Sequence, residues 1–202
     1  MAIIINLVYE DAISEFVMAK LLKSFNGKFE IGISYNGNGY GYIRTKINGF
    51  NEASISSTFF VLTDLDNNPC PISLIEDWLK KPRTPNFIFR VAVREVEAWL
   101  LADRLGFAEF TGVAIANIPT NPDLEIDPKQ TLINISKRSK KRSIKNEIVP
   151  INSNAKIGPN YNERLMEYVS NYWDIGRAME QSESLRRTWI CLNEFRYKAP
   201  NL

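Results

Sequence analysis

Acidic side chains follow three apolar segments of the 202-residue chain, at the point where each segment ends. Glu10 follows the first segment, Asp64 and Asp66 follow the second, and Glu95 and Glu97 follow the third. Clustered carboxylates repel one another and raise each other's pKa, so such a site needs cations to neutralise it. Because carboxylates are hard oxygen ligands, we expect Mg²⁺ or Mn²⁺ as the cofactor. The predicted chemistry is phosphodiester hydrolysis, in which such ions activate water and stabilise the leaving oxygen.

The chain contains no histidine. Unless another subunit supplies an imidazole, this excludes Ser-His-Asp and Cys-His hydrolysis, His-ligated zinc sites and nucleases with a histidine base. The two cysteines, Cys70 and Cys191, cannot form a four-thiolate zinc site, and they indicate a reduced cytoplasmic protein. Acid, base and metal chemistry is therefore left to carboxylates, lysines and hydroxyl groups.

The spacing within each acidic pair makes a prediction of its own. On an extended strand end, Asp64 and Asp66 would point to the same side and could share a metal ion. Glu95 and Glu97 would do the same only if the chain is still extended there. If a helix has already begun at Arg94, the two are turned roughly 200° apart and only one faces the site. We favour Glu95 over Glu97.

Each cluster also has a simpler interpretation. A single glutamate such as Glu10 after a strand is often a charge favoured near a helix N-terminus. The Asp64-Leu65-Asp66 segment precedes Asn67-Asn68-Pro69 and could be a turn with side-chain caps. Three clusters at equivalent strand ends favour a common site over these alternatives.

Apolar runs and turn signals predict the elements that must position these acids. Uncharged runs rich in β-branched and aromatic residues predict buried strands, and they cover residues 2–8, 29–35, 58–63 and 87–93. Helical spacing follows Asp11, a predicted cap, and Pro71, a predicted first helical residue. Strands that alternate with helices predict an α/β fold with a mostly parallel central sheet flanked by helices. In such sheets, ligands bind at the carboxyl ends of the strands.

Beyond residue 106 the pattern changes, with turn residues over 117–128 and helical spacing over 162–172 and 184–195. We therefore predict an α/β core over 1–106 and a helical extension packed on it over 107–202. The apolar run at the start of the chain is too short to span a bilayer, so we expect no membrane anchor.

Two further segments have a composition of their own. Glycines at positions 37, 39 and 41 form a loop that lacks the Lys-Ser/Thr ending of a P-loop and opens no obvious helix, which predicts a flexible rim of the site. The aromatic and apolar side chains at helical spacing over 161–173 predict core rather than a base-stacking surface.

The segment 137–145 has six basic residues and no acid, in a chain whose net charge is only +2. Such a run could neutralise phosphates and make binding to nucleic acid steeply salt-dependent. The alternative is a solvated loop. Arg90 and Arg94 are further candidates, and the predicted nucleic-acid-binding set is Arg94, Lys137, Arg138, Lys140, Lys141 and Arg142.

Several stretches make the sequence resemble a family of bacterial Toprim-like proteins of uncharacterised function that is related to the overcoming-lysogenization-defect (OLD) nucleases. Together they span nearly the whole chain. The matching stretches are V-Y-E-D-A-I-S-E-F-V at 8–17, I-N-G-F-N-E-A at 47–53, V-L-T-D-L-D-N-N-P-C at 61–70, F-R-V-A-V-R-E-V-E-A-W-L-L-A-D at 89–103, P-K at 128–129, G-P-N-Y-N at 158–162 and S-E-S-L-R-R at 182–187.

This resemblance implies a Toprim fold, in which a glutamate after the first strand and a D-x-D after a later one bind magnesium. Here these residues are Glu10, Asp64 and Asp66, and Glu15 matches an additional acidic ligand of two-metal relatives. Glu95 and Glu97 match the E-x-E of the family itself. Asp11 stands where many Toprim domains have glycine, which bears on how closely a phosphate approaches the turn.

The resemblance also implies a partner, because relatives often accompany an AAA- or ABC-type ATPase in defence or mobile-element loci. The leading hypothesis is a metal-dependent nuclease that acts on DNA or RNA. A second is a non-catalytic subunit that binds nucleic acid or an ATPase and keeps the acids as a structural cation site. A third is a small-molecule phosphohydrolase, since an apolar strand that ends in D-x-D also occurs in haloacid-dehalogenase-like phosphatases.

Overall fold

The computed structural model describes residues 1–37 and 39–199. The chain forms two compact units, one made of Met1–Val93 with the segment that begins at Arg187, and the other of Arg94–Arg186. We call them the sheet unit and the helical unit. Their bounds differ from the predicted division into 1–106 and 107–202, which stays a prediction about domains.

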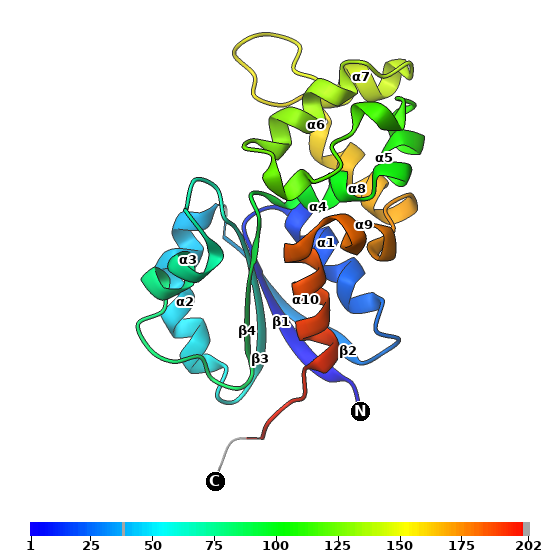
Figure 1. Ribbon diagram of the computed structural model, residues 1–202. Coiled ribbons are helices and arrows are strands. Elements are labelled where there is room, and N and C mark those ends of the chain that lie inside the picture. The colour runs from blue at the N-terminus through cyan, green and yellow to red at the C-terminus, as the bar shows by residue number, and fades with distance from the viewer. Residues whose placement is uncertain (38, 200–202) are drawn as a thin grey trace. The chain divides into compact units, whose positions relative to one another are not determined.

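The sheet unit has a four-stranded sheet in the order β2-β1-β3-β4, and every neighbouring pair in it is parallel. Each strand agrees with a predicted one to within one residue at either end, which confirms an α/β fold with a parallel sheet (Figure 1). The strands are β1 (Ile3–Tyr9), β2 (Phe29–Asn36), β3 (Thr58–Asp64) and β4 (Phe87–Ala92).

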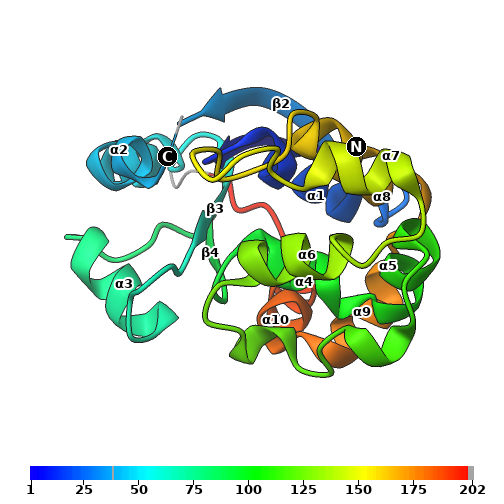
Figure 2. The same ribbon diagram turned by 90° about the horizontal axis from the view of Figure 1, so that it is seen from above.

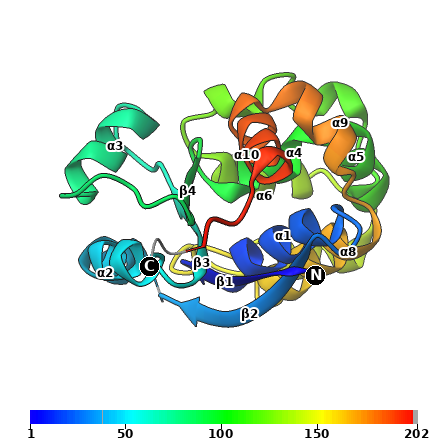
Figure 3. The same ribbon diagram turned by 90° about the horizontal axis from the view of Figure 1, so that it is seen from below.

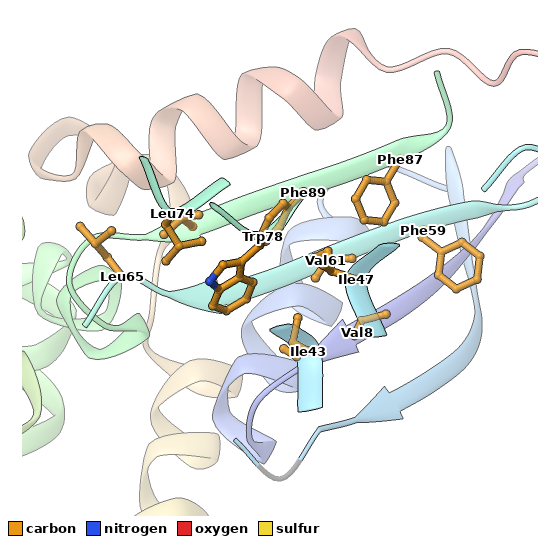
Figure 4. Packing of buried hydrophobic residues seen from close by; sticks show 11 residues of the cluster. Val8, Ile43, Ile47, Phe59, Val61, Leu65, Leu74, Trp78, Phe87 and Phe89 are labelled. Carbon is orange, nitrogen blue, oxygen red and sulfur yellow. The ribbon is translucent and has the colours of Figure 1, made fainter. Parts of the chain in front are cut away.

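Helices cover both faces of this sheet. Figures 1 and 3 show α2 (Tyr40–Ala53) and α3 (Pro71–Trp78) on one side, and α1 (Ala12–Lys23) with the later part of α10 (Glu183–Glu194) on the other. On the α2 and α3 side, both helices and all of β1, β3 and β4 contribute to one apolar cluster (Figure 4). Its buried members are Val8, Ile43, Ile47, Phe59, Val61, Leu65, Leu74, Trp78, Phe87, Phe89 and Val91.

The first turns of α1 and α3 follow from local side-chain chemistry. The carboxylate of Asp11 accepts a 2.8 Å hydrogen bond from the backbone N–H of Ser14, so Asp11 is the cap of α1 that its residue type predicts. Pro71 occupies the first position of α3, where no backbone donor is needed.

The glycine-rich segment behaves differently from its prediction. Helix α2 begins at Tyr40, directly after Gly39, whose φ of 111° is open to glycine and costly for other residues. The prediction that this segment opens no helix is therefore wrong, because Gly39 turns the chain straight into one. Asn38, which belongs to the predicted loop, lies outside the described residues.

The helical unit is built around one short helix, α4, of which all seven residues are buried. It contacts α5, α6 and α9, as Figure 2 shows. The predicted helices over 162–172 and 184–195 are found within one residue, as α8 and α10. The helices are α4 (Val96–Ala102), α5 (Arg104–Thr111), η1 (Ile115–Asn117), η2 (Pro122–Leu124), α6 (Pro128–Ser136), α7 (Arg142–Ile148), α8 (Tyr161–Asn171), α9 (Ile175–Gln181) and the start of α10.

The aromatic segment that includes α8 is core, as its spacing predicts. Tyr161, Tyr168 and Trp173 are each 2% exposed or less. Their polar atoms are satisfied within the unit: Tyr168 Oη donates to the carbonyl of Leu100 at 3.0 Å, and Trp173 Nε1 donates to the carbonyl of Trp99 at 3.0 Å. These rings are therefore not available to stack on bases.

In the part of the chain that the structure describes, no helix is both long and apolar enough to cross a membrane.

Candidate functional site

The carboxyl ends of β1 and β3 carry the first two predicted acids. These strands are parallel neighbours, Glu10 follows the last residue of β1, and Asp64 is the last residue of β3. Glu10 Oε1 accepts a hydrogen bond of 2.9 Å from the backbone N–H of Asp64 and another from the hydroxyl of Thr63. The side chain of Glu10 thus reaches across the strand ends to its neighbour.

Asp66 completes this group, with a backbone that the sequence does not predict. Its φ is +48°, in the left-handed region, which few residues other than glycine, asparagine and aspartate occupy. The chain is therefore not extended through Asp66, and the argument that two-residue spacing puts Asp64 and Asp66 on one side fails. One cause is the turn that follows β3, in which the N–H of Asn68 donates to the carbonyl of Leu65 at 3.0 Å.

The electrostatics of Glu10 reflect its surroundings. Burial raises the pKa of Glu10, the negative charges of Asp66 and Asp11 raise it further, and the hydrogen bonds from Thr63 and Asp64 oppose the rise. The ionised form is thus held by two donors but disfavoured by desolvation and by neighbouring acids. A cation at this edge of the sheet would relieve both costs.

The glycine-rich segment borders the same end of β1. The N–H of Gly37 donates to the carbonyl of Tyr9 at 2.8 Å, and the N–H of Gly39 donates to the carbonyl of Glu10 at 3.1 Å. This is the position expected of a rim beside the acidic group. The predicted flexibility of the rim stays a prediction.

Glu15 lies in the first turn of α1, where its carboxylate has another partner. The pKa of the Tyr9 phenol is raised to about 12, mainly by burial and then by a hydrogen bond to Glu15 and its negative charge. Glu15 is therefore engaged with Tyr9, and its role as a metal ligand stays a prediction.

Glu95 and Glu97 form a second acidic group, within the helical unit. Glu95 precedes α4 with an extended backbone, whereas Glu97 lies in the first turn of α4 and is 1% exposed. Of the two predicted alternatives, the helical one is found, because α4 has begun between the two residues. Glu95 is half-buried and Glu97 is enclosed.

Lys129, the second residue of α6, connects the two glutamates. Its backbone N–H donates to Glu95 Oε2 at 2.9 Å, and its ammonium Nζ lies 3.4 Å from Glu97 Oε1. The hydroxyl of Tyr161 donates to the same oxygen of Glu97 at 3.0 Å. The buried charge of Glu97 is thus paired and hydrogen-bonded, as a buried carboxylate requires.

Glu95 has a pKa close to neutral. Burial is the largest cause that raises the pKa of Glu95 to about 7, the charge of Glu97 adds to it, and Lys129 opposes the rise. A half-buried carboxyl with such a pKa can gain and lose a proton near physiological pH, which suits general acid or base work.

Lys129 and Tyr161 are site residues that the sequence argument missed. Both lie in stretches that carry the family resemblance, Pro128-Lys129 and 158–162, but nothing in their local pattern assigns a role. A lysine after a proline and a tyrosine at helical spacing are ordinary features. Their function emerges only when distant segments meet at Glu97.

The predicted phosphate-binding residues are at or near the surface. Arg94 is half-buried next to Glu95, and Arg90 of β4 is half-buried and donates from Nε to the hydroxyl of Thr188 at 3.2 Å. The basic residues of 137–145 are all exposed, in the turn between α6 and α7 and on α7 itself.

The structure thus brings Glu10, Asp64 and Asp66 together in the sheet unit, and Glu95 with Glu97 in the helical unit. Among residues 1–37 and 39–199, no three acidic or cysteine side chains form a group that could hold a metal ion by themselves. Magnesium is commonly bound by one or two carboxylates, with water and substrate phosphate completing its shell. A carboxylate pair at the strand ends suits that mode of binding.

Comparisons with known proteins are sparse. No family model matches the chain, and no curated protein sequence is similar to it. Among solved structures, the C-terminal region of the Burkholderia pseudomallei OLD protein is similar, with 13% identity and a TM-score of 0.47 over 96% of this chain and 98% of that one. The predicted resemblance to OLD proteins thus has a counterpart among solved structures. The likeness is too distant to transfer the role of any residue.

Proposed function

We propose that this protein is a Mg²⁺- or Mn²⁺-dependent nuclease that hydrolyses phosphodiester bonds of DNA or RNA. The observation that carries the proposal is the bond from the N–H of Asp64 to Glu10, which gathers acids at the carboxyl ends of β1 and β3. In parallel α/β sheets this edge is where ligands bind. Residues with no catalytic or binding duty seldom concentrate negative charge there at the cost of raised pKa values.

The donor set fits a hard divalent cation. Thr63 and Asp64 both donate to Oε1 of Glu10, which leaves Oε2 without a hydrogen-bond donor among the described residues. Glu10, Asp64 and Asp66 would hold the ion, with Glu15 as a further candidate. When bound, such an ion supplies Lewis-acid activation of the phosphodiester and of water.

The residues of the chain have separate roles in this proposal. Thr63 and the N–H of Asp64 fix the orientation of Glu10, and the left-handed backbone of Asp66 aims its carboxylate away from the line of β3. Glu95, with a pKa of about 7, accepts or donates a proton, while Lys129 and Tyr161 hold Glu97 beside it. Arg94 and the basic residues of 137–145 contact phosphates.

A nuclease assay tests the proposal. Purified protein is incubated with end-labelled DNA and RNA in Mg²⁺, in Mn²⁺ and in EDTA, beside Glu10→Gln, Asp64→Asn and Asp66→Asn. We expect cleavage that EDTA abolishes and that each variant lowers at least a hundredfold. Glu76→Gln is the matched control, since it removes one exposed carboxylate from α3 of the same unit. Cleavage by all three variants at the wild-type rate would remove these acids from the mechanism.

A second candidate function is a non-catalytic subunit that binds nucleic acid or an AAA- or ABC-type ATPase. The absence of a three-ligand group among the described residues favours it, because a binding subunit needs only a weak structural cation site. It predicts no cleavage by the wild-type chain and capture of an ATPase that Asp64→Asn does not disturb. Cleavage that depends on Glu10 and Asp64 would exclude it.

A further inference from the structure

The structure separates the basic residues of 137–145 into two groups. In the first group, side chains are committed to the fold. Lys137 Nζ donates to Oδ1 of Asn134 at 3.1 Å, one turn earlier in α6. Arg138 Nη1 donates to Oδ1 of Asn117 at 2.9 Å, which ties the end of α6 to the segment after α5.

Lys141 anchors the turn between α6 and α7. Its ammonium donates to the carbonyls of Glu109 and Phe110 at 2.8 and 3.0 Å, in the last turn of α5, where such groups lack helical partners. The hydroxyl of Ser139 donates to the carbonyl of Thr111 beside them. The turn is therefore held to α5 on both sides of Lys140.

The second group is Lys140, Arg142 and Lys145. All three are exposed, and none forms a hydrogen bond or ion pair with another residue in the described ranges. Arg142 and Lys145 are three residues apart on α7 and so share one face of that helix. Ile144 and Ile148, at 4% and 0% exposure, point into the unit instead.

Three unpaired cations on an anchored segment suit a ligand with repeated negative charge. An anionic membrane is a poor fit, because membrane-surface helices insert an apolar face and the isoleucines of α7 are already buried. The exposed neighbours are Ser143 and Asn146, whose polar groups commonly contact phosphates. Residues 137–148 contain no aromatic side chain that could stack on a base. The chemistry is that of the phosphodiester backbone.

We infer that Lys140, Arg142 and Lys145 form a surface that binds the backbone of nucleic acid without sequence preference, whereas Lys137, Arg138 and Lys141 hold the segment in place. This rests on the proposed function for the choice of ligand. It requires no metal and no cleavage, so it can be tested separately.

The test is fluorescence anisotropy of a labelled DNA duplex in EDTA, from 50 to 300 mM NaCl. The variant is Lys140→Gln, Arg142→Gln and Lys145→Gln combined. Each lost phosphate contact lowers the slope of log K against log salt by about 0.9, so the variant should lose about 2.7 from the slope. The matched control changes Lys23, Lys46 and Lys80 to glutamine, three exposed lysines of the sheet unit. It should keep the wild-type slope.

Folding of each variant is checked by thermal unfolding, and both should melt within a few degrees of the wild type. A wild-type slope in the triple variant overturns the inference, as does an equal loss in the control. Loss of binding to phosphatidylserine vesicles with unchanged duplex binding would assign the surface to a membrane instead. A wild-type chain that binds duplex but does not cleave it in Mg²⁺ would overturn the nuclease proposal alone.

Discussion

Arg177 binds both carboxylate oxygens of the fully buried Asp103, with Nε 2.7 Å from Oδ1 and Nη2 2.8 Å from Oδ2. The same carboxylate accepts from the backbone N–H groups of Gly106 at 3.0 Å and Asp174 at 2.7 Å. Asp103 thus joins the starts of α5 and α9. The last acid of the motif at 94–103 therefore has a structural role, whereas Glu95 and Glu97 earlier in it meet Lys129.

Replacing Asp103 by alanine should lower the free energy of unfolding by about 3 kcal/mol. This is the lower end of the range for a broken buried pair, because Arg177 is 42% exposed and water can solvate it. The loss also strands two backbone N–H groups. Urea denaturation measures it, with Arg177→Met expected to cost less. A change below about 1 kcal/mol would show that the pair does not hold α5 and α9 together.

Stability should fall as pH rises from about 4.5 to 7. The folded-state pKa of Glu95 is raised from 4.5 to about 7, so in this window the folded protein binds the proton that the unfolded chain has lost. Above pH 7 both states are ionised and this contribution becomes constant. Urea unfolding at pH 5, 6, 7 and 8 should show a decline that Glu95→Gln reduces. An identical pH dependence in the variant would contradict the assignment of this pKa.

Divalent metal should stabilise the wild-type chain but not Glu10→Gln. Without metal, the variant should be at least as stable, because glutamine removes a desolvated charge while its carbonyl oxygen still accepts from Thr63 and Asp64. A ligand at a hundred times its Kd adds about 2.7 kcal/mol to the stability of the form it binds. Melting temperatures with and without 10 mM MgCl₂ provide the measurement. Equal metal-induced shifts in both proteins would move the ion away from Glu10.

The left-handed backbone of Asp66 allows its charge to be separated from its conformation. Asp66→Gly and Asp66→Asn tolerate a φ of +48°, so both should fold with nearly wild-type stability. Asp66→Val should cost about 1–2 kcal/mol, because a β-branched side chain is strained there. If the carboxylate acts on phosphodiesters, all three lose activity while only valine loses stability. Full activity in the glycine variant would leave Asp66 a turn residue.

The sequence by itself determined the elements and the placing of acids at their ends. Uncharged β-branched runs located the four strands, and Asp11 and Pro71 marked helix starts, because these signals depend on residues close together in the chain. Since parallel strands end at one sheet edge, the meeting of Glu10 with Asp64 also followed from the order of strands and helices.

Only the tertiary structure decided which contacts each acid makes. Glu97 is enclosed by Lys129 and Tyr161, whose segments lie 32 and 64 residues further along the chain, and no local pattern encodes such a meeting. The same holds for the basic segment, where the carbonyls of α5 claim Lys141 and leave Lys140 unpaired. Periodicity reports which side of an element is buried. The partners of a buried charge depend on the packing of elements that are distant in sequence.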